Sequence, residues 1–168
     1  MAVTSMANSS IANYNKSNNV SGERLPLGSG GDYEGETNGY RYHVFTQSGT
    51  FTARRAGQVE CLLIAGGGSG GAAGGAGGGG GAGGLIRTRV SVPAGANTVV
   101  VGDGGAAATS PANGNVGNDS TFAGLTAKGG GYGATNPSAG GTGGSAGGGG
   151  GGSSSTGNGG VAIDSATF

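Results

Sequence analysis

The chain of 168 residues contains 46 glycines and has no formal net charge, because eight Lys and Arg residues balance eight Asp and Glu residues. Leu, Ile, Val and Phe together supply 25 of the 168 residues, below the roughly 20% that ordinary hydrophobic cores contain. No basic stripe for phosphate groups is present, and no run of about eighteen large apolar residues could span a bilayer, so we expect neither nucleic-acid binding nor membrane insertion.

Residues 1–39 are rich in Asn and Ser and form a zone distinct from the glycine-rich domain at residues 40–168. Such a segment either is a floppy terminus or orders on a partner, where new contacts offset the entropy lost on ordering. We predict an extended docking arm. The candidate contact residues in this arm are its sparse apolar side chains, Met6, Ile11, Tyr14 and Leu25.

Alternating residue types predict strands from residue 40 onward. Tyr40, Tyr42 and Val44 alternate with Arg41 and His43, so His43 is expected to point outward from a half-buried strand. Further strands are predicted to start near residue 50 and to cover residues 59–65, 85–92, 97–101, 120–127 and 161–163. Because no segment has a helical apolar stripe, the predicted fold class is all-β, with a small β-sandwich-like core.

Two glycine tracts, residues 66–84 and 129–160, interrupt these strands. In the first tract the other residues are Ser69 and alanines, and such small side chains let neighbouring backbones approach closely. Extended segments with three residues per turn have no internal hydrogen bonds, so they can bond to adjacent segments instead. The tracts are therefore either packed segments of the polyglycine II type or disordered glycine-rich loops.

Residues that could carry chemistry are sparse. The one cysteine, Cys61, lies in an apolar run and is read as a buried strand residue, and the one histidine, His43, has no nearby metal-ligand partner in the sequence. Asp103 and Asp119 lie beside glycine or asparagine in turns, where Asp has a structural role. We therefore predict no enzyme activity, no catalytic residue, no metal site and no cofactor.

The order of the pieces is more specific than any single motif. Residues 59–65 lead into Gly-Gly-Gly-Ser-Gly-Gly at 66–71, and Val-Ser-Val-Pro-Ala-Gly follows at 90–95. Val-Val-Val-Gly-Asp-Gly-Gly at 99–105 and Asp-Ser-Thr-Phe at 119–122 come next. This series, over about residues 44–163, resembles the glycine-rich domain of tailed-phage virion proteins found in tail fibres and adhesins, especially of cyanophages. Domains of this kind commonly end with an apolar strand that completes the domain. Only residues 161–163 are available for such a strand here. We therefore expect either that a neighbouring subunit completes the domain or that the chain is part of a longer protein.

The resemblance implies a virion structural protein, most simply a tail fibre or appendage component that contributes to assembly and host attachment. Its partners would be other virion proteins, a host surface glycan and further copies of itself, with a homotrimer favoured. Glycan-contacting loops are expected at residues 106–118 and 132–138, where the candidate receptor-contact residues are Asn113, Asn115, Tyr132 and Asn136.

A second role within the virion class, and two other classes of protein, also fit the sequence. Within the virion class, a capsid decoration protein differs from a tail fibre only in copy number and position. Outside that class, a free polyglycine-helix protein that binds ice or another surface predicts thermal hysteresis. A disordered, silk-like structural protein predicts no cooperative unfolding.

Overall fold

The computed structural model of the chain describes residues 2–6, 27–38, 40–72, 76–151 and 157–163. These residues form ten strands and no helix, which confirms the all-β prediction. The strands are β1 (Ala2–Met6), β2 (Gly28–Ser29), β3 (Tyr33–Thr37), β4 (Tyr40–Phe45), β5 (Gly49–Ala53), β6 (Gly57–Ile64), β7 (Leu85–Val92), β8 (Gly95–Val100), β9 (Ser120–Phe122) and β10 (Leu125–Ala127).

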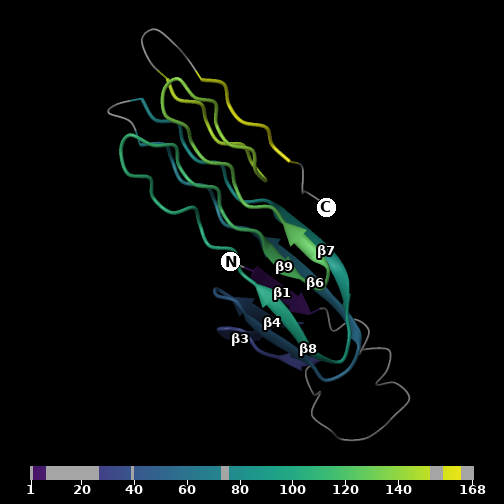
Figure 1. The fold of residues 1–168 in the computed structure, drawn as a ribbon. Coiled ribbons are helices and arrows are strands. Elements are labelled where there is room, and N and C mark those ends of the chain that lie inside the picture. The colour runs from purple at the N-terminus through teal and green to yellow at the C-terminus, as the bar shows by residue number, and fades with distance from the viewer. Residues whose placement is uncertain (1, 7–26, 39, 73–75, 152–156, 164–168) are drawn as a thin grey trace, which may run out of the picture.

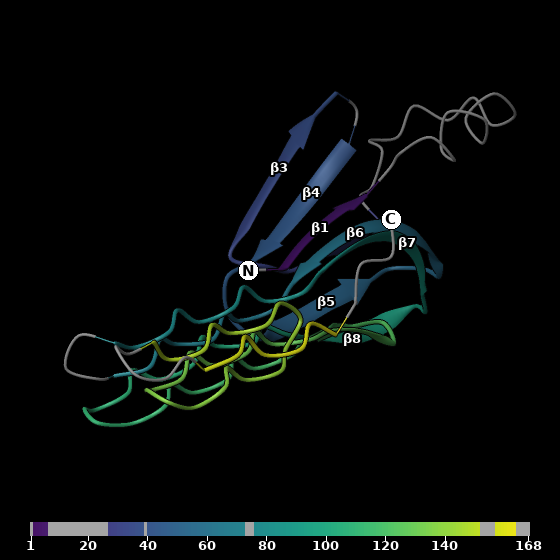
Figure 2. The ribbon, with the colours of Figure 1, turned by 90° about the horizontal axis from the view of Figure 1, so that it is seen from above.

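The strands form two five-stranded sheets that pack into a small sandwich (Figures 1 and 2). The first sheet has the order β3-β4-β1-β6-β7, and the second has the order β10-β9-β8-β5-β2. All neighbouring strands are antiparallel. Antiparallel sheets can bury one face and solvate the other, which suits a chain with few apolar residues.

The core between the sheets is small and aromatic. Phe51 of β5 is fully buried, and its ring packs edge-on against the rings of Phe122 and His43, with centroid distances of 6.2 and 5.2 Å. Cys61 of β6 is buried in the same cluster, as predicted, and burial raises the pKa of its thiol to about 11. The side chains on alternate positions of β6 and β7, among them Val59, also point into this core.

The predicted orientation of β4 is wrong. His43 is fully buried and Phe45 is almost so, whereas Tyr40 and Tyr42 lie on the opposite, outer face. The His43 ring is held by a 2.7 Å hydrogen bond between Nδ1 and the carbonyl oxygen of Gly30. A tyrosine can cover an exposed sheet face because its ring is apolar and its hydroxyl is polar, so alternation alone does not reveal which face is buried.

Residues 120–127 form a hairpin and not the single strand predicted. The strands β9 and β10 pair antiparallel and are joined by Ala123 and Gly124. Both turn residues have positive φ, 47° and 83°, which is the backbone conformation of the tightest hairpin turns. The turn therefore reverses the chain within eight residues.

Three strands from the first 39 residues belong to the two sheets. β1 pairs with β4 and β6, β3 pairs with β4, and β2 pairs with β5. Met6 is the last residue of β1, whereas Ile11, Tyr14 and Leu25 lie outside the described residues. The docking role of this segment stays a prediction.

The glycine tracts form a second packing unit, which we call the glycine bundle: residues 66–72, 76–84, 102–118, 129–151 and 157–163. Its extended segments leave from one end of the sandwich and return to it (Figure 1). The connection from β6 to β7 runs out and back once, as does that from β8 to β9. After β10 the chain forms further segments that bond to these.

Hydrogen bonds between bundle segments repeat every third residue. The amides of Ala65, Gly68 and Gly71 donate to the carbonyls of Gly84, Gly81 and Gly78 at 2.8–3.0 Å. The intervening amides of Gly66, Ser69 and Ala72 donate to a different segment, at Asn118, Asn115 and Ala112. This period of three is the repeat of the polyproline II helix, and it matches the packed polyglycine prediction rather than the disordered one.

The segments lie so close that many positions accept only glycine. A Cβ atom at Gly68 would lie 2.2 Å from the carbonyl oxygen of Gly131, and one at Gly66 would lie 2.0 Å from that of Asp103. The obstructing atoms are backbone atoms, so no side chain can move aside to make room. Glycine is therefore required here for close approach of the backbones and not for flexibility.

Residues 161–163 do not form a closing strand. Ala162 makes a single parallel bridge to Gly143, and Val161 and Ile163 remain 68% and 46% exposed. The apolar side chains at the end of the described chain thus add surface rather than core.

Candidate functional site

The two loops predicted to contact a receptor both run to the end of the glycine bundle that lies farthest from the sandwich (Figure 1). We call this end, residues 106–113 and 135–138, the distal end. The two loops come from different connections, one between β8 and β9 and one after β10. Because the bundle segments lie side by side, residues more than twenty positions apart in sequence meet there.

A side-chain contact joins the two loops. The Asn113 Oδ1 atom accepts hydrogen bonds from the backbone amide of Thr135 at 2.8 Å and from its hydroxyl at 3.1 Å. Asn136 follows directly and is exposed. The structure therefore brings Asn113 and the Asn136 loop together, and Thr135 is a member of the site that the sequence did not reveal.

Asn115 has a different environment. Its amide nitrogen Nδ2 donates to the carbonyl of Ala106 at 2.9 Å, and its backbone amide donates to the Ser69 hydroxyl at 2.8 Å. The same hydroxyl donates to the Ala106 carbonyl at 2.7 Å. Asn115 thus joins neighbouring segments, and no local pattern predicts that Ser69 is the shared partner.

Tyr132 is the aromatic residue of the predicted site. It is half-buried and lies one three-residue turn before Thr135. Its ring covers Gly141, where an added Cβ would lie 2.3 Å from the ring atom Cδ1. The missing side chain at Gly141 therefore leaves room for the ring beside the bundle, and the residue remains partly exposed. An isolated aromatic residue in a glycine tract is the sequence signal for this arrangement.

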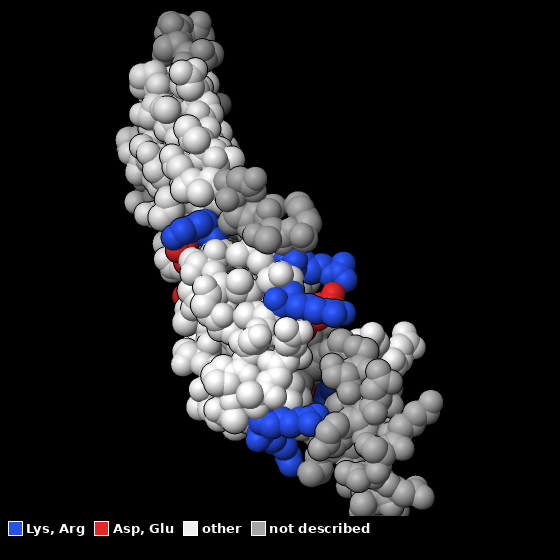
Figure 3. Space-filling model, turned by 90° about the vertical axis from the view of Figure 1, so that its right-hand side faces the viewer, with Lys and Arg blue, Asp and Glu red and all other residues white. Residues whose placement is uncertain are grey.

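Among the described residues, the charged side chains lie in the sandwich and at the base of the bundle, and the part of the bundle visible in Figure 3 is white. The single charged residue among the bundle residues is Asp103, near the end of β8. At the base, Lys128 Nζ lies 2.7 Å from Asp119 Oδ2. This lysine, together with the backbone amide of Gly129, lowers the pKa of the Asp119 carboxyl. The distal end consequently offers neutral hydrogen-bonding groups, and the Tyr132 ring lies one turn before it.

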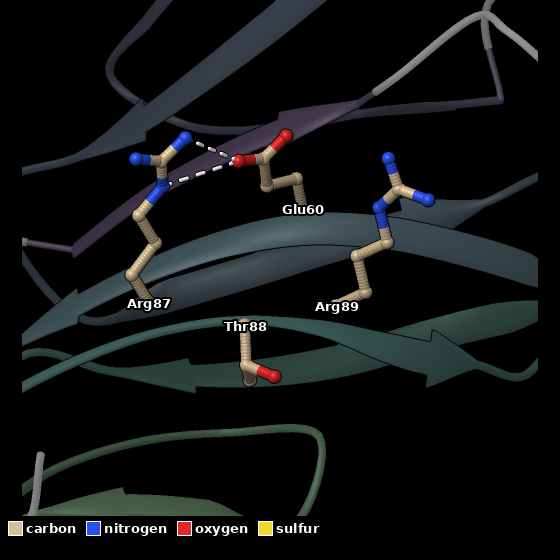
Figure 4. Close-up of a pocket in the computed structure, with 4 residues that line it drawn as sticks. All are labelled: Glu60, Arg87, Thr88 and Arg89. Atoms are coloured by element: carbon tan, nitrogen blue, oxygen red, sulfur yellow. Dashed lines mark hydrogen bonds and ion pairs between the residues drawn. The ribbon is translucent and has the colours of Figure 1, made fainter. Parts of the chain in front are cut away.

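A second feature lies on the outer face of the first sheet, away from the bundle. Glu60, Arg87, Thr88 and Arg89 line an open depression between β6 and β7 (Figure 4). Arg87 donates from Nε and Nη2 to Glu60 Oε1 at 3.2 and 2.8 Å. This pair is solvent-exposed, and exposed ion pairs contribute at most about 1 kcal/mol to stability.

Within the described ranges, His, Cys, Asp and Glu form no group of three or more that could hold a metal ion. Among those residues, no helix is long and apolar enough to cross a membrane.

Fold and site together define an all-β protein in which a small sandwich carries a bundle of backbone-packed glycine segments. The chain belongs to the glycine-rich domain family, whose model matches residues 45–166. No curated protein and no solved structure matches the chain. The match confirms the glycine-rich domain, whereas the narrower resemblance to tailed-phage fibres stays a prediction.

Proposed function

We propose that this protein is a phage virion structural protein, namely a tail fibre or appendage component that contributes to assembly and host attachment. The observation that carries the proposal is the glycine bundle, an ordered and almost uncharged projection that ends in neutral loops. An appendage needs a stiff element that presents a contact surface at a distance from its anchor, and the bundle has these properties.

Stiffness follows from the hydrogen bonds between segments. Residues 66–72 bond to segments on several sides, through Gly66, Gly68 and Ser69 among others. Bending the bundle would break several such bonds together, and an unpaired buried backbone group costs about 1–3 kcal/mol. Order in the bundle therefore does not depend on large side chains.

The chemistry of the distal end and of the neighbouring Tyr132 ring favours a neutral, hydroxyl-rich ligand such as a host surface glycan. The exposed part of the Tyr132 ring can stack against the apolar face of a sugar. The side chains of Asn113 and Asn136 lie one turn farther along the bundle and carry amide donors and acceptors suited to hydroxyl groups. The absence of charge from the bundle beyond Asp103 gives an anionic ligand no counter-ion there.

Exposed apolar side chains on the described surface favour assembly with other virion proteins or further copies. Tyr33 and Val161 are 65% and 68% exposed, and Val116 and Ile163 are 51% and 46% exposed. Together with a core this small, they suggest that neighbouring subunits bury surface that one copy leaves open. A homotrimer is the assembly that we propose.

The proposal is tested by cryo-electron microscopy of intact particles of a phage that encodes this chain. We expect ordered density for the sandwich and bundle at a tail position, with the distal end pointing away from the particle. Density on the capsid, at many copies per particle, would replace the fibre role with a decoration role. Absence of the chain from the particle would contradict both.

The attachment role is tested separately by adsorption of particles to host cells. Tyr132→Ala should reduce adsorption about tenfold or more, since stacking on an aromatic ring contributes on the order of 1.4 kcal/mol. Tyr132→Phe should keep most of the adsorption because the ring remains. Tyr40→Ala, on the outer face of strand β4 of the sandwich, is the matched control and should adsorb normally.

A free surface-binding protein is the second candidate, because the bundle is an ordered and neutral polyglycine array. Such an array would bind ice or another periodic surface without a virion. Thermal hysteresis of the purified protein, together with its absence from particles, would favour this candidate over the first.

A further inference from the structure

The first sheet contains a strand that comes from far away in the sequence. β1 lies between β4 and β6, where Ala2–Met6 pair with residues 41–45 and Ala2–Ser5 pair with residues 60–63. These pairings occupy the centre of the sheet order β3-β4-β1-β6-β7. In Figure 2, β1 runs between its two partners along their length.

The position filled by β1, which we call the strand slot, cannot stay empty in the folded sandwich. Strands in a sheet are about 4.8 Å apart, so β4 and β6 face each other across roughly 10 Å. Neither strand can pair with the other at that distance, and their inner backbone groups would lack partners. The residues that flank the slot on its inner face, among them His43 and Cys61, belong to the buried core.

The filling strand is joined to the rest of the chain by a long connection. Residues 7–26 separate β1 from the next described residue, Leu27. At about 3.3–3.6 Å per residue, twenty residues can span up to about 70 Å. A connection of this length lets β1 reach the slot of its own chain or that of an adjacent copy.

Filling the slot from a second copy reproduces the same strand pairs. The ten strands and their registers are unchanged, so exchange costs no contacts, which is the condition under which domain swapping occurs. A connection of this length gives its own end an effective concentration on the order of millimolar. Copies held side by side in an assembly reach similar local concentrations, and reciprocal exchange adds a link between subunits.

We propose that residues 2–6 of one copy fill the strand slot between β4 and β6 of a second copy, so that the protein assembles by strand exchange. The partner at this surface is therefore another molecule of the same chain. The proposal rests on strand register and chain length and does not depend on the virion role.

Cysteine cross-linking of mixed variants tests the exchange directly. Ser5 and Glu60 are register partners across β1 and β6. Full-length Ser5→Cys and Glu60→Cys proteins, each also carrying Cys61→Ala, are refolded together and oxidised. Exchange predicts a disulfide-linked dimer that contains one copy of each variant.

Position 89 supplies the matched control. Arg89 is the register partner of Glu60 on β7, one strand farther from Ser5, or roughly 10 Å away. This separation exceeds the limit of about 7 Å between Cα atoms for a disulfide. A mixture of Ser5→Cys with Arg89→Cys should therefore give no mixed dimer, and equal dimer from both mixtures would overturn the proposal.

Two further measurements decide the question if no mixed dimer forms. In the double variant Ser5→Cys/Glu60→Cys, a disulfide confined to single chains would overturn the proposal. Light scattering of the unmodified chain should give an oligomeric mass. A monomeric full chain would overturn the proposal as well.

Discussion

The sandwich and the glycine bundle solve the same packing problem with different groups. In the sandwich, side chains such as Phe51 and Phe122 fill the space between two sheets. In the bundle, backbone lies against backbone, and the contacts at Gly68 and Gly131 leave no room for a methyl group. Glycine content therefore does not measure disorder, because glycine also permits the closest packing that a chain can reach.

The two regions also differ in the direction of their hydrogen bonds. A strand has side chains above and below the sheet and bonds only to the strands on its two sides. A segment with a period of three directs successive residues to different sides, so Gly68 and Ser69 bond to different neighbours. Further segments can therefore be added to the bundle in two directions, whereas further strands can be added to a sheet in only one.

The largest effect should come from emptying the side-chain core. Phe51→Ala removes a fully buried ring that contacts His43 and Phe122, and such changes cost about 3–5 kcal/mol. Urea unfolding followed by circular dichroism measures this loss. Tyr33→Ala, at a site that is 65% exposed, should change stability by less than about 0.5 kcal/mol. Similar losses for both variants would mean that the sandwich is not held by this core.

The packing of the bundle should be disrupted by adding side-chain atoms to its glycines rather than by removing side chains. Gly68→Ala places a Cβ 2.2 Å from the Gly131 carbonyl oxygen, and overpacking of this kind costs about 1–3 kcal/mol or more. Gly79→Ala has nothing within 4 Å of the new Cβ. It should stabilise the protein by about 0.4–1 kcal/mol because it restricts the unfolded chain. If both alanines have the same effect in thermal unfolding, the bundle is not packed as described.

A smaller effect is expected where a side chain joins two bundle loops. Asn113→Ala removes the acceptor for the amide and hydroxyl of Thr135, at a cost of about 0.5–1.5 kcal/mol. Hydrogen exchange at the Thr135 amide should become faster. Asn113→Asp keeps an acceptor oxygen and should restore the protection. Unchanged exchange in the alanine variant would show that this contact does not order the distal end.

The smallest expected effect is a loss of folding stability at acid pH, and it should be confined to the sandwich. The Asp32 carboxylate accepts hydrogen bonds from the amide and hydroxyl of Thr46 at 2.6 and 2.7 Å and from Gln47. These bonds lower the pKa of Asp32 from 3.8 to about 2. Because the folded pKa is below the unfolded one, the stabilisation is present above about pH 4 and is lost as pH falls toward 2.

Unfolding midpoints at pH 6 and near pH 2 measure this acid effect. Asp32→Asn should be less stable than the parent protein at pH 6, and the difference should shrink near pH 2. A difference that does not depend on pH would contradict the role given to the carboxylate. Exchange of bundle amides, far from Asp32, should show no such difference between the parent and the variant.

Local patterns predicted the parts of the fold that depend on neighbouring residues. The alternation at residues 85–92 predicted the strand that the structure has as β7, and the apolar run around Cys61 predicted a buried strand, which is β6. The tiny side chains of the first tract made packed segments one of two predicted alternatives, because only small residues let backbones meet. These features could be predicted because each is a property of a few consecutive residues.

The remaining features depend on pairings between distant residues. Nothing near β1 in the sequence indicates that it lies between β4 and β6. The burial of His43 depends on the carbonyl of Gly30 and on the ring of Phe51, which come from other strands. At the distal end, the contact between Asn113 and Thr135 requires two segments to align across the bundle.

The three-residue period also governs how such a protein could change in length. Deleting one residue from a bundle segment would place a side chain where a carbonyl now lies, and every later contact in that segment would be displaced. Adding three residues to an outgoing segment and three to the returning one would preserve all contacts and lengthen the bundle by about 9 Å. The reach of the molecule is thus adjustable in discrete steps, by paired insertions of whole turns.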